Sequence, residues 1–98
     1  MNLDECTQAI RAKVGDDSGL GATLKFDCGD DGTIYIDGRS VPNGVTNASG
    51  DADCTVGITL ANLNALLSGE LEPATGFMTG KLKVAGDMAV AMRLQRVI

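Results

Sequence analysis

The side chains able to do chemistry in this chain are few in kind, because its 98 residues include no histidine. Triads, proton relays and metal sites that depend on an imidazole are therefore excluded. Any reaction would have to use Asp, Glu, Lys or Cys. The three cysteines, Cys6, Cys28 and Cys54, are widely spaced and form no CxxC pair, so they indicate neither a disulfide framework nor a zinc site. We expect them to be small buried apolar residues.

A thiol enzyme built on Cys28 or Cys54 is the remaining covalent alternative. Both residues fall on the inward faces of predicted strands, and no basic residue is placed to activate them. Acidic residues beside glycines could in principle bind calcium. However, the spacing of an EF-hand loop and its closing Glu are missing, and turns exposed to solvent have the same composition. These acids are Asp27, Asp30 and Asp31 around Gly29, and Asp51 with Asp53. We predict no catalytic residue, no metal site and no cofactor.

The composition narrows the range of partners. Lys and Arg number 8 against 13 Asp and Glu, and this net charge of -5 repels nucleic-acid phosphates and anionic lipid headgroups alike. The longest apolar stretch, from Val84 to Met92, is interrupted by Gly86 and Asp87 and is far shorter than the roughly 20 residues of a membrane span. We expect no nucleic acid partner, no membrane span and at most transient membrane contact. The acidic start of the chain is unlike a secretory signal, which predicts a cytoplasmic location.

The first third of the chain predicts a helix and a β-hairpin within a single domain spanning residues 1–98. Asn2 and Glu5 have capping-box spacing, and apolar residues then repeat at helical intervals over residues 3–14. Strict alternation over residues 22–28 and 33–37 predicts two strands joined by a glycine-rich turn.

Three further strands and a second helix complete the predicted fold. A short edge strand near Ser40 and Val41 should stop at Pro42, which has no amide hydrogen to donate. A fourth strand covers residues 54–58, and Thr59 then caps a helix that Gly69 ends. Pro73 allows a brief turn before a fifth strand over residues 81–86. The outward strand positions carry mixed charges, so one face of the sheet should be wet and the helices should cover the other: Lys25, Asp27, Tyr35, Asp37, Asp53, Lys81 and Lys83.

The last predicted helix, Met88 to Ile98 behind an Asp87 cap, is unusually apolar. Its apolar arc covers roughly 220°, about twice what a one-sided core contact needs. Part of this surface therefore needs a second partner, which could be more core, another chain or a lipid. Gln95 lies inside the arc, where its amide would bond a ligand hydroxyl or reach water.

Three segments, residues 53–59, 66–73 and 77–95, resemble the sterol carrier protein 2 domain family. The specific part is the pattern F-x-x-G-K-L-K-[VI]-x-G-[DN]-M-x-x-A-M-[KR]-L-Q, which runs from Phe77 to Gln95. The resemblance covers about the last half of the chain. The first half agrees with the family in the order of its helix, hairpin and strands.

The resemblance implies a two-layer α+β fold: a five-stranded, mostly antiparallel sheet with helices covering one face and an apolar tunnel between them. It also implies non-catalytic binding or transfer of a sterol, fatty acyl or isoprenoid lipid. The chain ends at Val97-Ile98, where peroxisomal members continue to a targeting tripeptide, so we expect a free-standing, prokaryotic-style member that presents lipid to a partner enzyme. The ligand-binding candidates are Phe77, Met78, Leu82, Met88, Met92, Leu94 and Gln95.

A second function stays open at this point. The apolar C-terminal helix could instead serve a structural or protein-interaction module, as a homodimer contact or as the docking surface of an enzyme accessory domain. Lys81 and Lys83 could likewise dock an acidic partner, or only keep their strand soluble.

Overall fold

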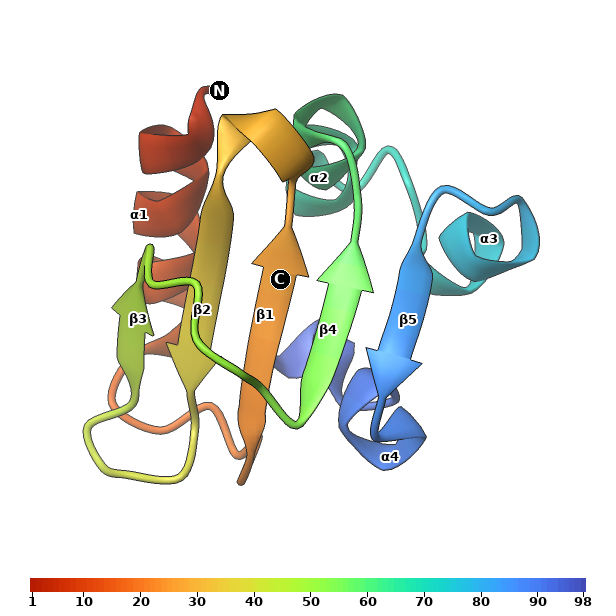
Figure 1. Ribbon diagram of the computed structural model, residues 1–98. Coiled ribbons are helices and arrows are strands. Elements are labelled where there is room, and N and C mark those ends of the chain that lie inside the picture. Colours follow the sequence, from red (N-terminus) through yellow and green to blue (C-terminus); the bar gives the residue numbers. More distant parts are fainter.

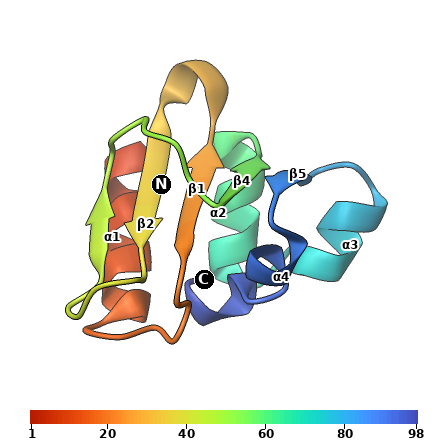
Figure 2. The same cartoon turned by 60° about the horizontal axis from the view of Figure 1, so that its bottom comes forward.

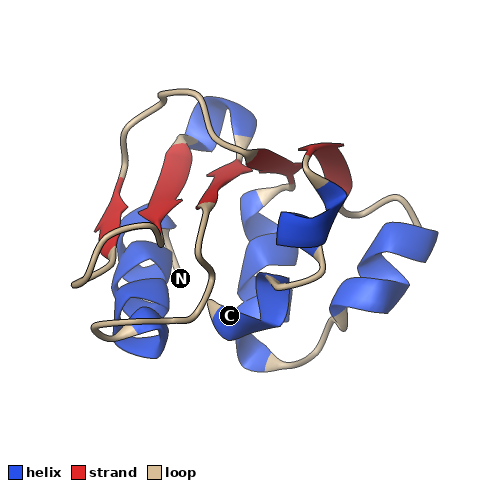
Figure 3. Ribbon diagram, turned by 90° about the horizontal axis from the view of Figure 1, so that it is seen from below, coloured by secondary structure: helices blue, strands red, loops and turns tan.

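The computed structural model describes residues 1–98 and arranges them in two layers (Figure 1). One layer is a five-stranded sheet with the order β3-β2-β1-β4-β5. Helices α1, α2 and α4 pack on one face of this sheet, while α3 extends beyond its edge at β5 (Figure 3). The strands are β1 Thr23–Asp27, β2 Thr33–Asp37, β3 Gly44–Thr46, β4 Cys54–Gly57 and β5 Lys83–Gly86. The helices are α1 Leu3–Val14, α2 Leu60–Ser68, α3 Pro73–Met78 and α4 Met88–Ala91, with 3₁₀ turns η1 Gly29–Asp31 and η2 Leu94–Arg96.

The strand pairing confirms the predicted fold class. β1 pairs with β2 in antiparallel and with β4 in parallel orientation, and the β2–β3 and β4–β5 pairs are antiparallel. The sheet is therefore mostly antiparallel. Alternation along the strands places one set of side chains against the helices, and these are fully buried: Leu24, Phe26, Ile34, Ile36 and Val56.

Helix α1 begins where the sequence predicts. The Asn2 side chain accepts a hydrogen bond from the Glu5 backbone N–H (2.8 Å), and the Glu5 carboxylate accepts one from the Asn2 backbone N–H (3.1 Å). This reciprocal pair satisfies two amides at the start of the helix. The inward face of α1 then joins the core through Cys6, Thr7, Ile10 and Val14.

The prediction for the third strand was wrong in position. Strand β3 lies after Pro42, at Gly44–Thr46, and Val41 is 71% exposed. The strand forms where it does because Val45 can enter the core beside α1. Its carbonyl accepts a hydrogen bond from Arg11 Nη2 (2.8 Å). It is an edge strand, as expected.

The C-terminal helix was also predicted too long. α4 ends at Ala91, and the chain continues through the 3₁₀ turn η2. The buried residues Ala91, Leu94 and Val97 are spaced three apart, which suits the three residues per turn of a 3₁₀ helix. In contrast, the segment after Pro73 is a true helix, α3, where the sequence predicted only a turn.

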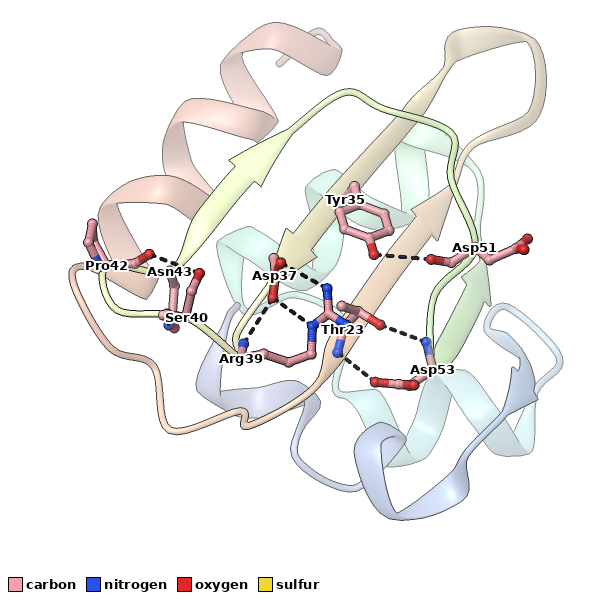
Figure 4. A network of polar contacts seen from close by, with 9 residues as sticks. All are labelled: Thr23, Tyr35, Asp37, Arg39, Ser40, Pro42, Asn43, Asp51 and Asp53. Atoms are coloured by element: carbon pink, nitrogen blue, oxygen red, sulfur yellow. Dashed lines mark hydrogen bonds and ion pairs between the residues drawn. The ribbon is translucent and has the colours of Figure 1, made fainter.

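The face of the sheet without helices is polar, as its charge pattern predicts. A loop over residues 47–53 crosses this face and is tied to it by hydrogen bonds (Figure 4). Tyr35 Oη donates to the Asp51 carbonyl (3.0 Å), and Lys25 Nζ donates to the Gly50 carbonyl (3.2 Å). The Asp53 carboxylate accepts the Thr23 backbone N–H (3.0 Å), and this bond holds the pKa of Asp53 below its ordinary value.

Candidate functional site

An apolar cleft of about 250 Å³ opens between α3 and the C-terminal segment, the two parts that flank β5 in Figures 1 and 2. Its lining is Pro73, Ala74 and Phe77 from α3, with Ala91, Met92, Leu94 and Gln95 from α4, η2 and the residues between them. None of these side chains is ionisable, and Gln95 carries the only polar side-chain group. The cleft can therefore bind an apolar molecule by burial and has one amide for a polar end.

Each wall of the cleft is held in place by its own local contacts. Pro73 is the first residue of α3, a position that suits its fixed φ and missing N–H. Gly76 is buried in α3, and a Cβ there would lie 2.9 Å from Leu82 Cγ, so only glycine allows this close packing. On the other wall, the Asp87 carboxylate accepts the Ala89 backbone N–H (2.8 Å) and begins α4.

The structure brings four of the seven predicted ligand-binding residues together at this cleft: Phe77, Met92, Leu94 and Gln95. The other three lie elsewhere. Leu82 is 3% exposed and belongs to the core, whereas Met78 and Met88 are 87% and 57% exposed and do not line the cleft.

Sequence reasoning missed Pro73, Ala74 and Ala91. Ala74 and Phe77 are three residues apart, so a helical reading of the segment after Pro73 would have placed them on one side of α3. The expectation of a turn hid this relation.

A second, larger cleft of about 440 Å³ lies where η1, the start of α2 and the loop before β5 meet. Only two of its nine lining residues are hydrophobic, and Lys81 and Lys83 form part of its wall. An apolar ligand would gain little from burial there, because the gain scales with apolar area removed from water. The smaller apolar cleft is therefore the better candidate for a lipid.

The three cysteines lie in the core, as the sequence predicts. Burial raises the pKa of Cys6, Cys28 and Cys54, and that of Cys28 reaches about 11. These thiols are protonated at neutral pH, whereas a cysteine nucleophile needs its thiolate form. This argues against the thiol-enzyme alternative.

None of the helices combines the length and the apolarity needed to cross a bilayer. Residues 8–98 match the sequence profile of the SCP-2 sterol transfer family. The chain belongs to this family. Sterol carrier protein 2 of Gallus gallus is 37% identical over 70 residues, which cover 70% of this chain and 13% of that protein. This SCP-2 domain thus spans a small part of its curated relative.

Solved structures of SCP-2 proteins confirm the fold. The crystal structure of sterol carrier protein 2 like 2 from Aedes aegypti superposes with a TM-score of 0.79 at 18% identity, covering 98% of this chain and 95% of that one. The solution structure of palmitated SCP2L2 from Aedes aegypti gives a TM-score of 0.72 at 20% identity, covering 99% and 94%. Membership of the SCP-2 family supports lipid binding or transfer as the general function of this domain, and a carrier role that is generally non-catalytic.

Proposed function

We propose that this domain is a non-catalytic lipid carrier that holds the apolar part of its ligand in the cleft between α3 and the C-terminal segment. One observation carries the proposal: this apolar cleft has no ionisable side chain in its lining, and five of its seven lining residues belong to the stretch from Phe77 to Gln95 that carries the family pattern. In this proposal Phe77, Met92 and Leu94 contact the ligand, and the Gln95 amide bonds its polar end.

The size of the cleft favours a thin ligand. Small-molecule pockets usually hold about 300–1,000 Å³, and about 250 Å³ lies just below that range. Among the sterol, fatty acyl and isoprenoid ligands that the sequence predicts, a single fatty acyl or isoprenoid chain suits this space better than fused sterol rings. The palmitated SCP2L2 offers a precedent on the same fold.

An enclosed tunnel between sheet and helices remains part of the proposal. It requires the cleft to deepen, because 22 buried apolar side chains fill the core as it stands. α3 is the wall that moves at least cost, since it has six residues and Gly76 is the buried one among them. Delivery of the ligand to a partner enzyme in the cytoplasm stays a prediction of the sequence.

Titration with a fluorescent long-chain fatty acid, followed by native mass spectrometry of the complex, tests the carrier function. We expect saturable, micromolar binding, because enclosing about 400 Å² of acyl surface is worth roughly 10 kcal/mol before association costs. Ala74→Trp should abolish fatty acid binding, because Ala74 is exposed and lines the cleft, so that the indole ring would fill the space for the ligand. Ala61→Trp is the matched control, because Ala61 is exposed on α2 and lines neither cleft. Non-saturable binding by the unmodified domain, or equal binding by both variants, would contradict the proposal.

The alternative of an interaction module keeps one supporting observation. Met78 and Met92 are 87% and 86% exposed, which is unusual for large apolar side chains. Sedimentation velocity separates the two functions, since a homodimer contact predicts a mass that rises with protein concentration. A concentration-independent monomer that binds fatty acid would leave only the carrier function.

A further inference from the structure

Arg93 lies in the middle of the C-terminal wall of the apolar cleft but does not line it. Its backbone joins α4 to η2: the Arg93 N–H donates to the Val90 carbonyl (2.9 Å), and the Arg93 carbonyl accepts the Arg96 N–H (2.9 Å). A contact that fixes Arg93 therefore also fixes the residues on either side of it. Three of these neighbours line the cleft: Met92, Leu94 and Gln95.

The Arg93 side chain reaches the loop that joins α1 to β1. Figure 2 shows this loop beside the C-terminal segment. Arg93 Nη1 donates a hydrogen bond to the Leu20 carbonyl, 73 positions away in the sequence. Arg96 lies against the same loop, since a Cβ at Gly19 would be only 2.9 Å from Arg96 Nη1. One wall of the cleft is thus attached to a distant part of the chain.

The loop gives Arg93 a fixed point of attachment. Leu20 is fully buried, and a Cβ at Gly38 would lie 2.8 Å from the Leu20 Cβ, so the chain packs closely there. The Ser18 hydroxyl accepts the Leu20 backbone N–H (3.2 Å), and the Ser18 backbone N–H donates to the Asn43 side chain (2.8 Å). Core packing and hydrogen bonds therefore hold the carbonyl that Arg93 uses.

The opposite wall, α3, has no comparable attachment. Its side-chain hydrogen bonds stay within the helix and its C-cap residue, where Thr79 Oγ1 donates to the Thr75 carbonyl (2.8 Å). The two walls of the cleft therefore differ, because a long-range side-chain bond holds only the C-terminal one.

We propose that Arg93 is a positioning residue for the lipid: its bond to Leu20 holds the C-terminal wall in the arrangement that presents Leu94 and Gln95 to the ligand. This role rests on the proposed function, since it concerns the same cleft. A wall that is fixed before binding costs no ordering free energy when the ligand arrives. A fixed Gln95 amide also selects a ligand by its polar end, because a hydrogen bond depends on direction as well as distance.

Fatty acid titration of the full 98-residue chain carrying Arg93→Met tests this role. The variant keeps a long side chain but loses the donor, and we expect the affinity to fall about tenfold, because the wall must then be ordered on binding. Arg11→Met is the matched control, since Arg11 Nη2 donates to the carbonyl of buried Val45 (2.8 Å) and neither residue lines the cleft. Urea denaturation should show similar losses of stability in both variants, whereas Arg11→Met should keep its affinity for fatty acid.

Two further variants separate the hydrogen bond from the charge of the guanidinium group. Arg93→Lys keeps a cationic donor for the single bond to Leu20 and should restore most of the affinity that Arg93→Met loses. Arg96→Met removes the same charge from the same segment and should change the affinity by less than about twofold, because exposed charges are screened by salt.

Gln95→Leu supplies a measurement that a purely structural role of Arg93 would not change. In the unmodified domain, loss of the amide should weaken fatty acid binding about fivefold, which corresponds to one hydrogen bond. In the Arg93→Met background the same substitution should cost less than about twofold, because the amide is no longer held toward the ligand. Circular dichroism verifies that each variant is folded.

Amide hydrogen exchange of the ligand-free domain tests the attachment by itself. Arg93→Met should speed exchange at the Val97 N–H, which donates to the Leu94 carbonyl (3.1 Å), and Arg11→Met should not. Equal exchange in the two variants, an affinity loss in Arg11→Met or Arg96→Met as large as in Arg93→Met, or additive costs of Arg93→Met and Gln95→Leu would overturn the positioning role. Failure of the unmodified domain to bind fatty acid would overturn the proposed function, and hydrogen exchange would still decide whether Arg93 holds the wall.

Discussion

Helix α1 and the C-terminal segment from Met88 to Ile98 both pack on the sheet, yet they use their apolar residues differently. α1 has 12 residues, and no large apolar side chain within it is exposed. The C-terminal segment also reaches the core, through Val90, Ala91, Leu94 and Val97, but it leaves Met88 and Met92 in contact with solvent.

The contrast separates apolar residues that the core requires from those that it does not. In α1 the stripe of apolar residues is no wider than the surface that packs against the core. Core packing alone therefore explains its apolar residues. In the C-terminal segment the stripe exceeds the contact, and one of its two exposed methionines, Met92, lines the apolar cleft. Surplus apolar surface beside a cleft is where a ligand or a membrane gains most from burial.

The largest expected effect is on stability, and it should appear on α1 only. Ile10→Ala should lower the free energy of unfolding by about 3 kcal/mol, because Ile10 is fully buried and the change leaves a cavity. Met92→Ala should lower it by less than about 0.5 kcal/mol. Urea denaturation measures both. Similar losses in the two variants would remove the distinction between the regions.

The next effect is on ligand binding, and it should appear on the C-terminal segment only. Met92→Asp places a carboxylate in the apolar cleft and should weaken fatty acid binding about tenfold or more. Gln8→Asp introduces the same group at an exposed position of α1 and should leave the affinity unchanged. Met88→Asp should cost less than about threefold, since Met88 does not line the cleft. A loss for Met88→Asp as large as for Met92→Asp would restore the wider site that the sequence predicts.

Local signals account for the parts of the fold that the sequence predicts well. The Asn2–Glu5 capping box sets the start of α1, and the Thr59 hydroxyl accepts the Asn62 backbone N–H (3.1 Å) at the start of α2. Gly69 ends α2 in the left-handed conformation, with φ +83°. Each of these ends is decided by residues within one turn, so a single sequence carries the information.

The remaining parts depend on tertiary contacts that no local pattern records. Strand β3 forms at Val45 because α1 offers a core position there, and η2 replaces a helix because Leu94 and Val97 both reach the core. The family pattern marked the walls of the cleft, but it does not tell which side of α3 or η2 a residue occupies. Leu82 was therefore included, whereas Ala74 precedes the pattern, which begins at Phe77, and was not.

Helix caps give a smaller effect that again distinguishes the two regions. Asn2→Ala removes the side-chain oxygen that accepts the Glu5 backbone N–H, while the backbone N–H of residue 2 can still donate to the Glu5 carboxylate, and it should lower the free energy of unfolding by about 1 kcal/mol. Asp87→Ala should lower it by about 0.5 kcal/mol, because α4 has four residues and the Asp87 backbone N–H keeps its bond to the Asp53 carbonyl (2.8 Å). Chemical denaturation of both variants checks the order, and a larger loss for Asp87→Ala would reverse the ranking of the two regions.

The smallest effect is a pH dependence whose largest part comes from Cys28, on the side of the core that α1 covers. Burial, and then the neighbouring Cys6, raise the pKa of the Cys28 thiol from 9.0 to about 11, and burial raises the pKa of Cys6 as well. The unfolded chain therefore loses these protons at lower pH than the folded domain does. The stability is fully present below pH 9.0 and declines as the pH rises toward about 11.

Urea denaturation under reducing conditions between neutral pH and pH 11 should show this decline. Cys28→Ala should flatten it, although that variant starts from a lower stability. A decline of equal slope in Cys28→Ala would place its cause elsewhere, for example at Cys54 on β4, whose pKa burial also raises. The C-terminal segment contains no cysteine, so its cleft gains no charge over this range. Fatty acid affinity should then hold up to the pH at which the domain itself unfolds.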